Sequence, residues 1–290
     1  MVFLFILYKI GETLAFFLPS WLAYYIAEKI ADVFFLFPVG KYKNYREAVL
    51  HNLTLFVESK DRIKCAREVF RNFARYIREF LWLGKISERR FFKEVIPLGI
   101  ENLDAALKIG KGVLLLSAHF GNWEWGGISL ALAGYKMCFL VRPHANPYTD
   151  KLFNNLRRGK RIKVIPVTQL RKLMEALNNN EVIAVLIDEG EKGVKVKIFN
   201  KVINFAAGPF KMAYRYGAVI SPAFIIRDRK TGKQKGIVEP PIILDFTLDM
   251  DRSIRQAAQK FADIMEDYLR FYPDHWLLLE KKQFYLRENV

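Results

Sequence analysis

The chain has 290 residues, a hydrophobic fraction of 52% and a formal net charge of +16. That length and apolar content suit one large domain with a substantial core, or a domain joined to a membrane-associated segment. The positive charge requires an anionic partner or surface, and nucleic acid, anionic phospholipid, lipid phosphates and acidic carrier proteins all qualify. Two cysteines without metal-ligand spacing exclude a disulfide framework and suit a reducing compartment.

The amino-terminal region is rich in apolar and aromatic residues. Two uncharged runs, Met1 to Tyr8 and Thr13 to Ala27, are both shorter than the ~18 to 20 residues of a clean transmembrane helix. Three arrangements remain open: a single span broken by Pro19, a helix lying in the bilayer surface, and a buried helical hairpin. We predict that residues 1–40 form a hydrophobic segment that anchors the protein to a membrane, and that they are not a signal peptide.

Beyond residue 40 the pattern is that of a single domain, residues 41–290. Lys41 to Leu53 and Asp61 to Leu83 have helical periodicity. Strand and helix patterns then alternate, with strands near 113–118, 137–141, 163–166, 182–187, 194–199, 218–226 and 236–243, and helices near 102–108, 123–133, 148–158, 169–177, 208–216 and 251–271. This alternation predicts an α/β fold with a largely parallel or mixed central sheet flanked by helices.

A histidine and a glutamate five residues apart follow the first of these strands. His119 comes directly after the apolar run Gly112 to Leu116, and Gly121-Asn122 predicts a turn before the next helix. Asn122 is a suitable N-cap, which places Glu124 in the first helical turn. Since the turn redirects the chain, we expect the Glu124 carboxylate to reach back toward the imidazole.

Such a pair has the chemistry of a general base. A carboxylate partner fixes the tautomer of His119 and stabilises its protonated form, so the pair could remove a proton from a hydroxyl. The alternative is a core histidine beside a helix-capping acid. A serine hydrolase is disfavoured because no G-x-S-x-G elbow is present, and one histidine with one glutamate gives too few ligands for zinc.

Other charged residues follow the later strands. Arg142 and Asp188 come at the predicted carboxyl ends of strands, where the ligand crevice of an open α/β sheet lies. Arginine next to a catalytic pair usually binds phosphate or carboxylate, so Arg142 and Arg157 are candidate substrate ligands. The alternatives are solvent-facing arginines and, for Asp188, a turn-forming residue.

These motifs together resemble the late lipid A acyltransferases, the lauroyl and myristoyl transferases with an HX4(D/E) motif. Besides His119 and Glu124, the resemblance rests on Arg67 to Glu79, Arg142 to Pro147, Arg157 fifteen residues after Arg142, Asp188 with Gly193, Phe199, Gly208-Pro209, and Tyr272 to Trp276. The chain departs from the family pattern at Glu189, where glutamine is common, and at Glu280-Lys281-Lys282, where many members carry His-Arg-Arg.

The resemblance implies a fold like that of glycerolipid acyltransferases. It also implies an O-acyltransferase that moves a fatty acyl chain from a thioester, acyl carrier protein or acyl-CoA, to a hydroxyl of a lipid A precursor. No cofactor beyond this co-substrate is expected, and the catalytic domain would lie on the cytoplasmic face of a cell inner membrane. Catalysis would fall to His119 and Glu124, with backbone N–H groups of Gly121 to Trp123 as oxyanion donors. Substrate would bind Arg142, Arg157, Asp188 and Asn122.

Two alternatives stay open. One is acylation of a phospholipid or glycolipid head group by the same chemistry. The other is a basic peripheral protein that only binds anionic lipid or nucleic acid. Such a protein would not need a strand-end histidine, turn and glutamate, and the aromatic strand motifs of RNA-binding domains are absent from the sequence. We therefore expect an anionic membrane surface as a partner and no nucleic acid.

Overall fold

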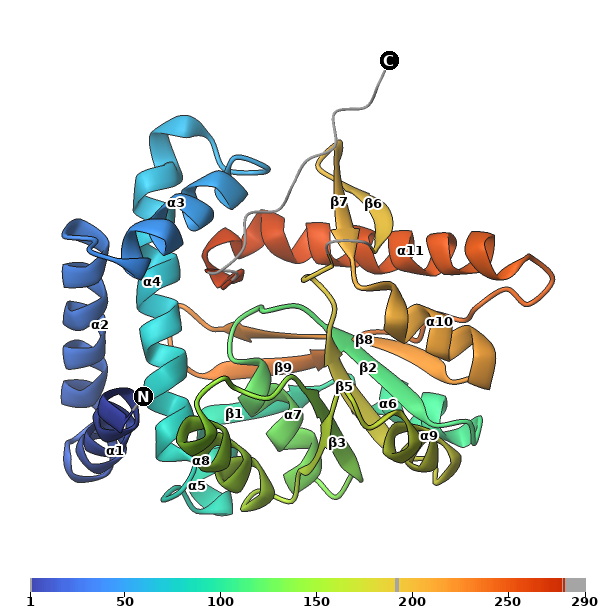
Figure 1. The fold of residues 1–290 in the computed structure, drawn as a ribbon, viewed down its shortest axis with the longest axis horizontal. Coiled ribbons are helices and arrows are strands. Elements are labelled where there is room, and N and C mark those ends of the chain that lie inside the picture. Colours follow the sequence, from blue (N-terminus) through green and yellow to red (C-terminus); the bar gives the residue numbers. More distant parts are fainter. Residues whose placement is uncertain (1, 191–192, 278, 280–290) are drawn as a thin grey trace.

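The computed structural model describes residues 2–190, 193–277 and 279, so Glu280-Lys281-Lys282 lies outside the described residues. It is a mixed α/β single domain in which helices flank a central seven-stranded sheet (Figure 1). In spatial order the strands are β1 (Val95–Leu98), β9 (Gln234–Val238), β8 (Val219–Arg227), β2 (Val113–Ser117), β5 (Val182–Leu186), β3 (Met137–Val141) and β4 (Lys163–Pro166). Only the β8–β9 pairing is antiparallel, so the predicted mixed sheet is confirmed.

Four strands differ from the sequence prediction, and one of them, β7 (Lys201–Phe205), was not predicted at all. The edge strand β1 was not predicted, because its Ile-Pro pair shows no clear alternation. The last strand, β9, ends at Val238, since the two prolines that follow cannot donate to a ladder. The segment predicted at 194–199 is β6 (Val194–Ile198), and it pairs with β7 (Lys201–Phe205) in a separate antiparallel hairpin.

Helices cover both faces of the sheet. From residue 41 to the end of the described chain the helices are α3 (Lys41–Leu53), which packs against α4, then α4 (Ser59–Trp82), α5 (Glu88–Glu94), α6 (Ile100–Lys108), α7 (Trp123–Leu132), α8 (Pro147–Arg158), α9 (Leu170–Asn178), α10 (Ala207–Tyr216), α11 (Met250–Phe271) and the short 3-10 helix η1 (Pro273–His275). Alternate residues of a strand point to opposite faces. Accordingly, Leu114 and Leu116 pack in the core with α9, α10 and α11, whereas Val113 and Leu115 pack in the core with α5 to α8.

The amino-terminal segment forms two helices, α1 (Val2–Phe17) and α2 (Ser20–Leu36), separated at Pro19. Proline has no N–H to continue a helix, and here it stands at the N-cap of α2. Figure 1 shows α2 running beside α4, and Ala31 and Phe35 of α2 are buried in a core cluster with α4. Among the described residues, no helix combines the length and apolar composition needed to cross a bilayer.

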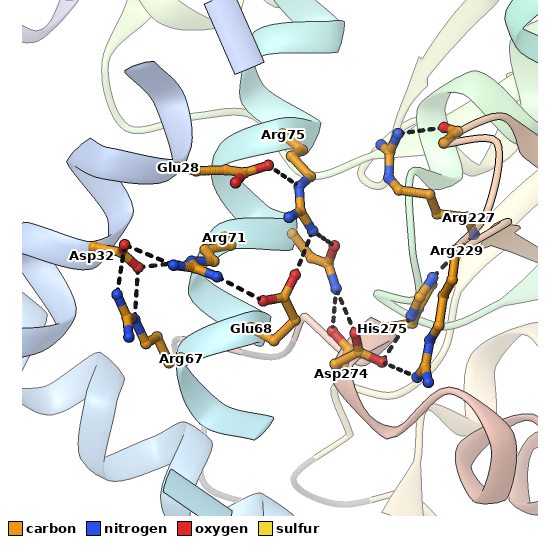
Figure 2. A network of polar contacts seen from close by, with 12 residues as sticks. Glu28, Asp32, Arg67, Glu68, Arg71, Arg75, Arg227, Arg229, Asp274 and His275 are labelled. Atoms are coloured by element: carbon orange, nitrogen blue, oxygen red, sulfur yellow. Dashed lines mark hydrogen bonds and ion pairs between the residues drawn. The ribbon is translucent and has the colours of Figure 1, made fainter. Parts of the chain in front are cut away.

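An ionic clamp fixes α2 to α4. Asp32 is buried, and both Arg67 and Arg71 donate two hydrogen bonds to its carboxylate at 2.7–2.8 Å (Figure 2). The hydrogen bonds from Arg71 and Arg67 hold the pKa of Asp32 well below its usual range, although burial opposes this. The clamp is therefore intact at neutral pH. Its contribution to stability is lost as the pH falls below the pKa of a free aspartate toward the lowered pKa of Asp32.

The same polar network continues from α4 to the end of the chain. Arg75 donates to Glu28 of α2 and to Asn72, and Asn72 donates to the carbonyl of Asp274 at 2.9 Å (Figure 2). Next along η1 is His275, whose Nε2 accepts from the backbone N–H of Arg227 at 3.0 Å. The amino-terminal helices and η1 thus share one helix, α4, as their support.

We predict that Asp32→Asn lowers the free energy of unfolding by about 2 kcal/mol, because two arginines lose their charged acceptor at a buried position. Urea unfolding followed by circular dichroism measures this loss. The control is Glu58→Gln, which removes a carboxylate that pairs with Lys60 in solvent and should leave the midpoint unchanged. Equal midpoints for Asp32→Asn and the wild type would show that the clamp does not stabilise the fold.

Candidate active site

The predicted site residues meet at one edge of the sheet. β2, β5 and β3 are neighbours and parallel, so His119, Asp188 and Arg142 follow carboxyl ends that lie side by side. A cavity of about 620 Å³ opens there, and its lining includes His119, Glu124, Arg142, Arg157 and Glu189. This volume is within the usual range for small-molecule and cofactor sites.

The carboxylate bonded to His119 is Asp188. Asp188 is fully buried, and it lies 2.8 Å from His119 Nδ1 while it accepts from the His119 backbone N–H at 3.0 Å. Trp276 Nε1 donates a further hydrogen bond at 2.8 Å. Burial alone would raise the pKa of Asp188, but the His119 charge and these hydrogen bonds outweigh it, so the pKa is lowered. Asp188 is therefore ionised at neutral pH.

An ionised Asp188 fixes the tautomer of the imidazole. Because the carboxylate can only accept, the proton of neutral His119 belongs on Nδ1, and Nε2 carries the lone pair. His119 Nε2 lies 3.8 Å from Glu189 Oε1, and Glu189 in turn pairs with Arg142 at 3.5 Å. The imidazole thus stands between two carboxylates from the end of β5, with its basic nitrogen toward the cavity-lining Glu189.

Glu124 is placed differently from the sequence prediction. Its buried carboxylate accepts from Arg157 Nε at 3.1 Å and from Arg157 Nη2 at 2.5 Å. Arg157 Nη1 donates to Asn154, so this guanidinium is buried and already paired. The expected bond of Glu124 to His119 is replaced by the bond of Asp188, because β5 brings a carboxylate directly beside Nδ1. Arg157, predicted as a substrate ligand, is therefore a buried partner of Glu124. Of the two predicted arginine ligands, Arg142 is the exposed one.

The turn after His119 has the predicted cap. Asn122 accepts from the backbone N–H of Trp125 at 3.0 Å, which confirms it as the N-cap of α7. Its amide donates to Glu79 at 2.7 Å, and Asn122 is buried, so its position favours support of the loop over the predicted contact with substrate. The Gly121 N–H donates to the His275 carbonyl at 2.8 Å, which removes it from the expected oxyanion donors.

Gly121 could not be another residue. Its φ is +59°, a conformation that residues with a Cβ rarely adopt, and an added Cβ would stand 2.1 Å from the Ile225 carbonyl oxygen. The loop is also paired with the end of the chain, since the Leu277 N–H donates to the His119 carbonyl and Phe120 bridges Trp276. The backbone of His119 is thereby held on both sides, since its carbonyl accepts from Leu277 and its N–H donates to the Asp188 carboxylate.

Glu79 supports the loop and was not singled out from the sequence. It is fully buried on α4 and accepts from Tyr24, Asn122 and Gln234 at 2.7 Å, and also from Arg227. Burial alone would raise its pKa, but Arg227 and these donors lower it. Glu79 lies in a charged helical stretch that looks like a solvated face. The one available signal was its position within the family-like Arg67 to Glu79 segment.

Much of the cavity lining is apolar. The apolar side chains that line the cavity come from α7 and the sheet and include Leu115, Leu130, Phe139, Ala184, Ile225 and Val238. Two glycines, Gly126 and Gly127, lie on the wall that α7 contributes, and a Cβ on Gly127 would stand 2.5 Å from the Phe139 ring. The site therefore joins an acid-base group to a hydrophobic slot.

We predict that Arg157→Ala lowers the free energy of unfolding by about 3–5 kcal/mol, because it leaves the Glu124 charge buried without its partner. The double variant Arg157→Met with Glu124→Gln removes both charges and should recover most of that loss. Urea unfolding compares the two, with Arg158→Ala as the exposed control. If the double variant is no more stable than Arg157→Ala, the two side chains do not act as a pair.

The chain matches the family of bacterial lipid A biosynthesis acyltransferases over residues 1–284. It is 26% identical to a phosphatidylinositol mannoside acyltransferase of Mycobacterium tuberculosis over 76% of this chain and 70% of that protein. It is 24% identical to the lipid A biosynthesis palmitoleoyltransferase of Escherichia coli, covering 77% and 72% of the two chains. With the lipid A biosynthesis acyltransferase of Haemophilus influenzae the identity is 24%, over 66% and 60%. The family match extends through the strand-end histidine, its buried carboxylate and the apolar slot, and the chain belongs to the bacterial lipid A biosynthesis acyltransferase family.

Proposed function

We propose that this acyltransferase moves a fatty acyl chain from a thioester, acyl carrier protein or acyl-CoA, to a hydroxyl of a membrane glycolipid. The observation that carries the proposal is the His119–Asp188 pair at a cavity whose lining is largely apolar. A base beside an apolar slot suits a reaction between a hydroxyl and an acyl chain. The thioester is the only co-substrate required, with no other cofactor.

The proposed chemistry follows from the tautomer of His119. His119 Nε2 takes the proton of the acceptor hydroxyl while the hydroxyl oxygen attacks the thioester carbonyl carbon. Asp188 stabilises the imidazolium that forms. When the tetrahedral intermediate collapses, the C–S bond breaks and the leaving thiolate takes the proton back from Nε2. Asp188 replaces Glu124 as the orienting carboxylate, and Glu124 with Arg157 builds the wall of the cavity.

The acceptor is proposed from the kinds of lipid in the relatives' names. Those names cover lipid A and phosphatidylinositol mannoside, and both are glycolipids. A lipid A precursor is the acceptor that we favour, because the family match covers nearly the whole chain. Acylation of a phosphatidylinositol mannoside or another glycolipid head group is the second candidate. Arg142 is exposed at the cavity, so it is the arginine that we assign to an anionic group of the substrate.

We further propose that α1 and α2 meet the surface of the cell inner membrane. Four apolar residues of α1, spaced by three or four positions, are exposed: Ile6, Ile10, Leu14 and Phe17. On α2, Trp21 and Tyr25 are also exposed, one helical turn apart. Aromatic side chains favour the headgroup region, and exposed apolar residues on neighbouring turns are typical of a helix that lies in the bilayer surface. Catalysis would then occur on the cytoplasmic face, where the thioester donors are.

The first test incubates the protein with acyl donors and with either lipid A precursor or phosphatidylinositol mannosides, followed by mass spectrometry of the lipids. His119→Ala should lower the rate of transfer by about 10²- to 10⁴-fold, because the base is lost. Asp188→Asn should lower it as well, since amide and carboxylate fix different tautomers. The control is His51→Ala, on α3 outside the cavity. Wild-type transfer by folded His119→Ala protein would refute the mechanism.

The second test addresses the membrane face. Trp21→Glu puts a charge at a position that is 71% exposed, so it should weaken binding to phospholipid vesicles without loss of fold. Leu170→Glu is the matched control, because Leu170 is exposed on α9, which Figure 1 shows well apart from α1 and α2. Vesicle flotation measures bound protein. Equal binding by the two variants would place the membrane contact elsewhere.

A further inference from the structure

Arg78 of α4 is a buried cation with no carboxylate among its described hydrogen-bond partners. It is 6% exposed, and its guanidinium carbon lies 4.3 Å from the ring centroid of Tyr24 and 4.4 Å from that of Trp82. Within the part of the chain that the structure describes, its Nε and Nη1 have no hydrogen-bond partner. Its Nη2 donates to Ser20 Oγ at 3.2 Å. Two ring faces offset only part of the cost of burying a charge.

A second arginine converges on the same hydroxyl. Arg90 of α5 donates from Nη2 to Ser20 Oγ at 3.4 Å, and its guanidinium carbon lies 4.7 Å from the Trp82 ring centroid. Two cations thus share one neutral oxygen, at distances longer than the 2.7–2.9 Å typical of arginine with a charged oxygen. The neighbouring carboxylate, Glu79, is already bonded by Arg227 and three other donors. Two positively charged side chains are therefore directed at the same atom, Ser20 Oγ.

Ser20 is also the first residue of α2, a helix of 17 residues. The N-cap residue, Pro19, makes no side-chain cap, so the positive end of the helix dipole adds to the charge of the two arginines. Phe17 and Trp21, on either side of Ser20 in the sequence, are 74% and 71% exposed. The hydroxyl at which both arginines point is therefore flanked in the sequence by two exposed aromatic residues.

We propose that Ser20, Arg78 and Arg90 bind the phosphate of an anionic phospholipid headgroup. Exposed aromatic residues prefer the depth of the headgroups, which is where the phosphates of the bilayer are. A lipid phosphate would supply the charged oxygens that neither arginine finds among the described residues, and it would fix the orientation of α1 and α2 on the surface. This inference rests on the membrane contact proposed above, and it adds a lipid that is neither donor nor acceptor.

The test uses the full chain and vesicles of phosphatidylcholine with and without phosphatidylglycerol. Arg90→Gln should raise the phosphatidylglycerol concentration needed for half-maximal binding by about fivefold. Ser20→Ala, which changes no charge, should raise it by about threefold. Arg89→Gln is the matched control, because Arg89 is the exposed neighbour on the same helix and its loss removes the same charge. Its effect should be clearly smaller, and thermal unfolding checks that every variant is folded.

Three outcomes would overturn the proposal. If Arg89→Gln matches Arg90→Gln and Ser20→Ala has no effect, the attraction is diffuse and no phosphate site exists here. If inorganic phosphate binds without vesicles in a manner that needs Ser20, and displaces the protein from phosphatidylglycerol, the ligand is a soluble phosphate. If Trp21→Glu abolishes binding but Ser20→Ala and Arg90→Gln do not alter it, the membrane face stands and the headgroup site fails. His119→Ala should bind vesicles like the wild type, so a failure of the acyl-transfer mechanism would be seen separately.

Discussion

The site depends on one buried carboxylate. Asp188 has no exposed surface, so its charge must be compensated by donors inside the protein. Two donors come from His119, its backbone and its ring, and the third is the indole of Trp276 near the end of the described chain. Asp188, which follows β5, therefore decides which way the imidazole points. Its hydrogen bonds also join three segments that are far apart in the sequence.

Two more buried carboxylates surround the same loop. Glu79 holds the Asn122 cap, and Glu124 sits in the first turn of α7 with Arg157 as its partner. Each carboxylate is matched by at least one cation or several neutral donors. The loop between β2 and α7 is consequently fixed from three directions, which keeps the histidine in place before any substrate binds.

The sequence was most informative about the residues that follow strand ends and least informative about the hydrogen-bond partners of those residues. Hydrophobic runs located β2, β3 and β5, and a parallel sheet necessarily brings the residues after them together, so His119, Arg142 and Asp188 were predicted at one edge. The bond between His119 and Asp188 spans 69 positions, and no local spacing indicates it. Five-residue spacing favoured Glu124 instead, because only nearby residues can be compared by periodicity. Glu79 was missed for a related reason, since a helical position facing other elements looks like a solvated one until those elements are placed.

The apolar residues of the first two helices lie in two different environments that composition could not separate. On α2, Ala31 and Phe35 are buried against α4, whereas Trp21 and Tyr25 are exposed. The hydroxyl of Tyr24, on the same helix, donates at 2.7 Å to Glu79, the carboxylate that also accepts from Asn122. Two hydrogen bonds, both to Glu79, therefore connect α2 to Asn122, the cap of the loop that carries His119. A helix that only tethered the domain would not need to complete the shell of a buried carboxylate. The surface that we propose to face the bilayer is thus held rigidly with respect to the base, which is the geometry required when the acceptor hydroxyl stays with its lipid in the membrane.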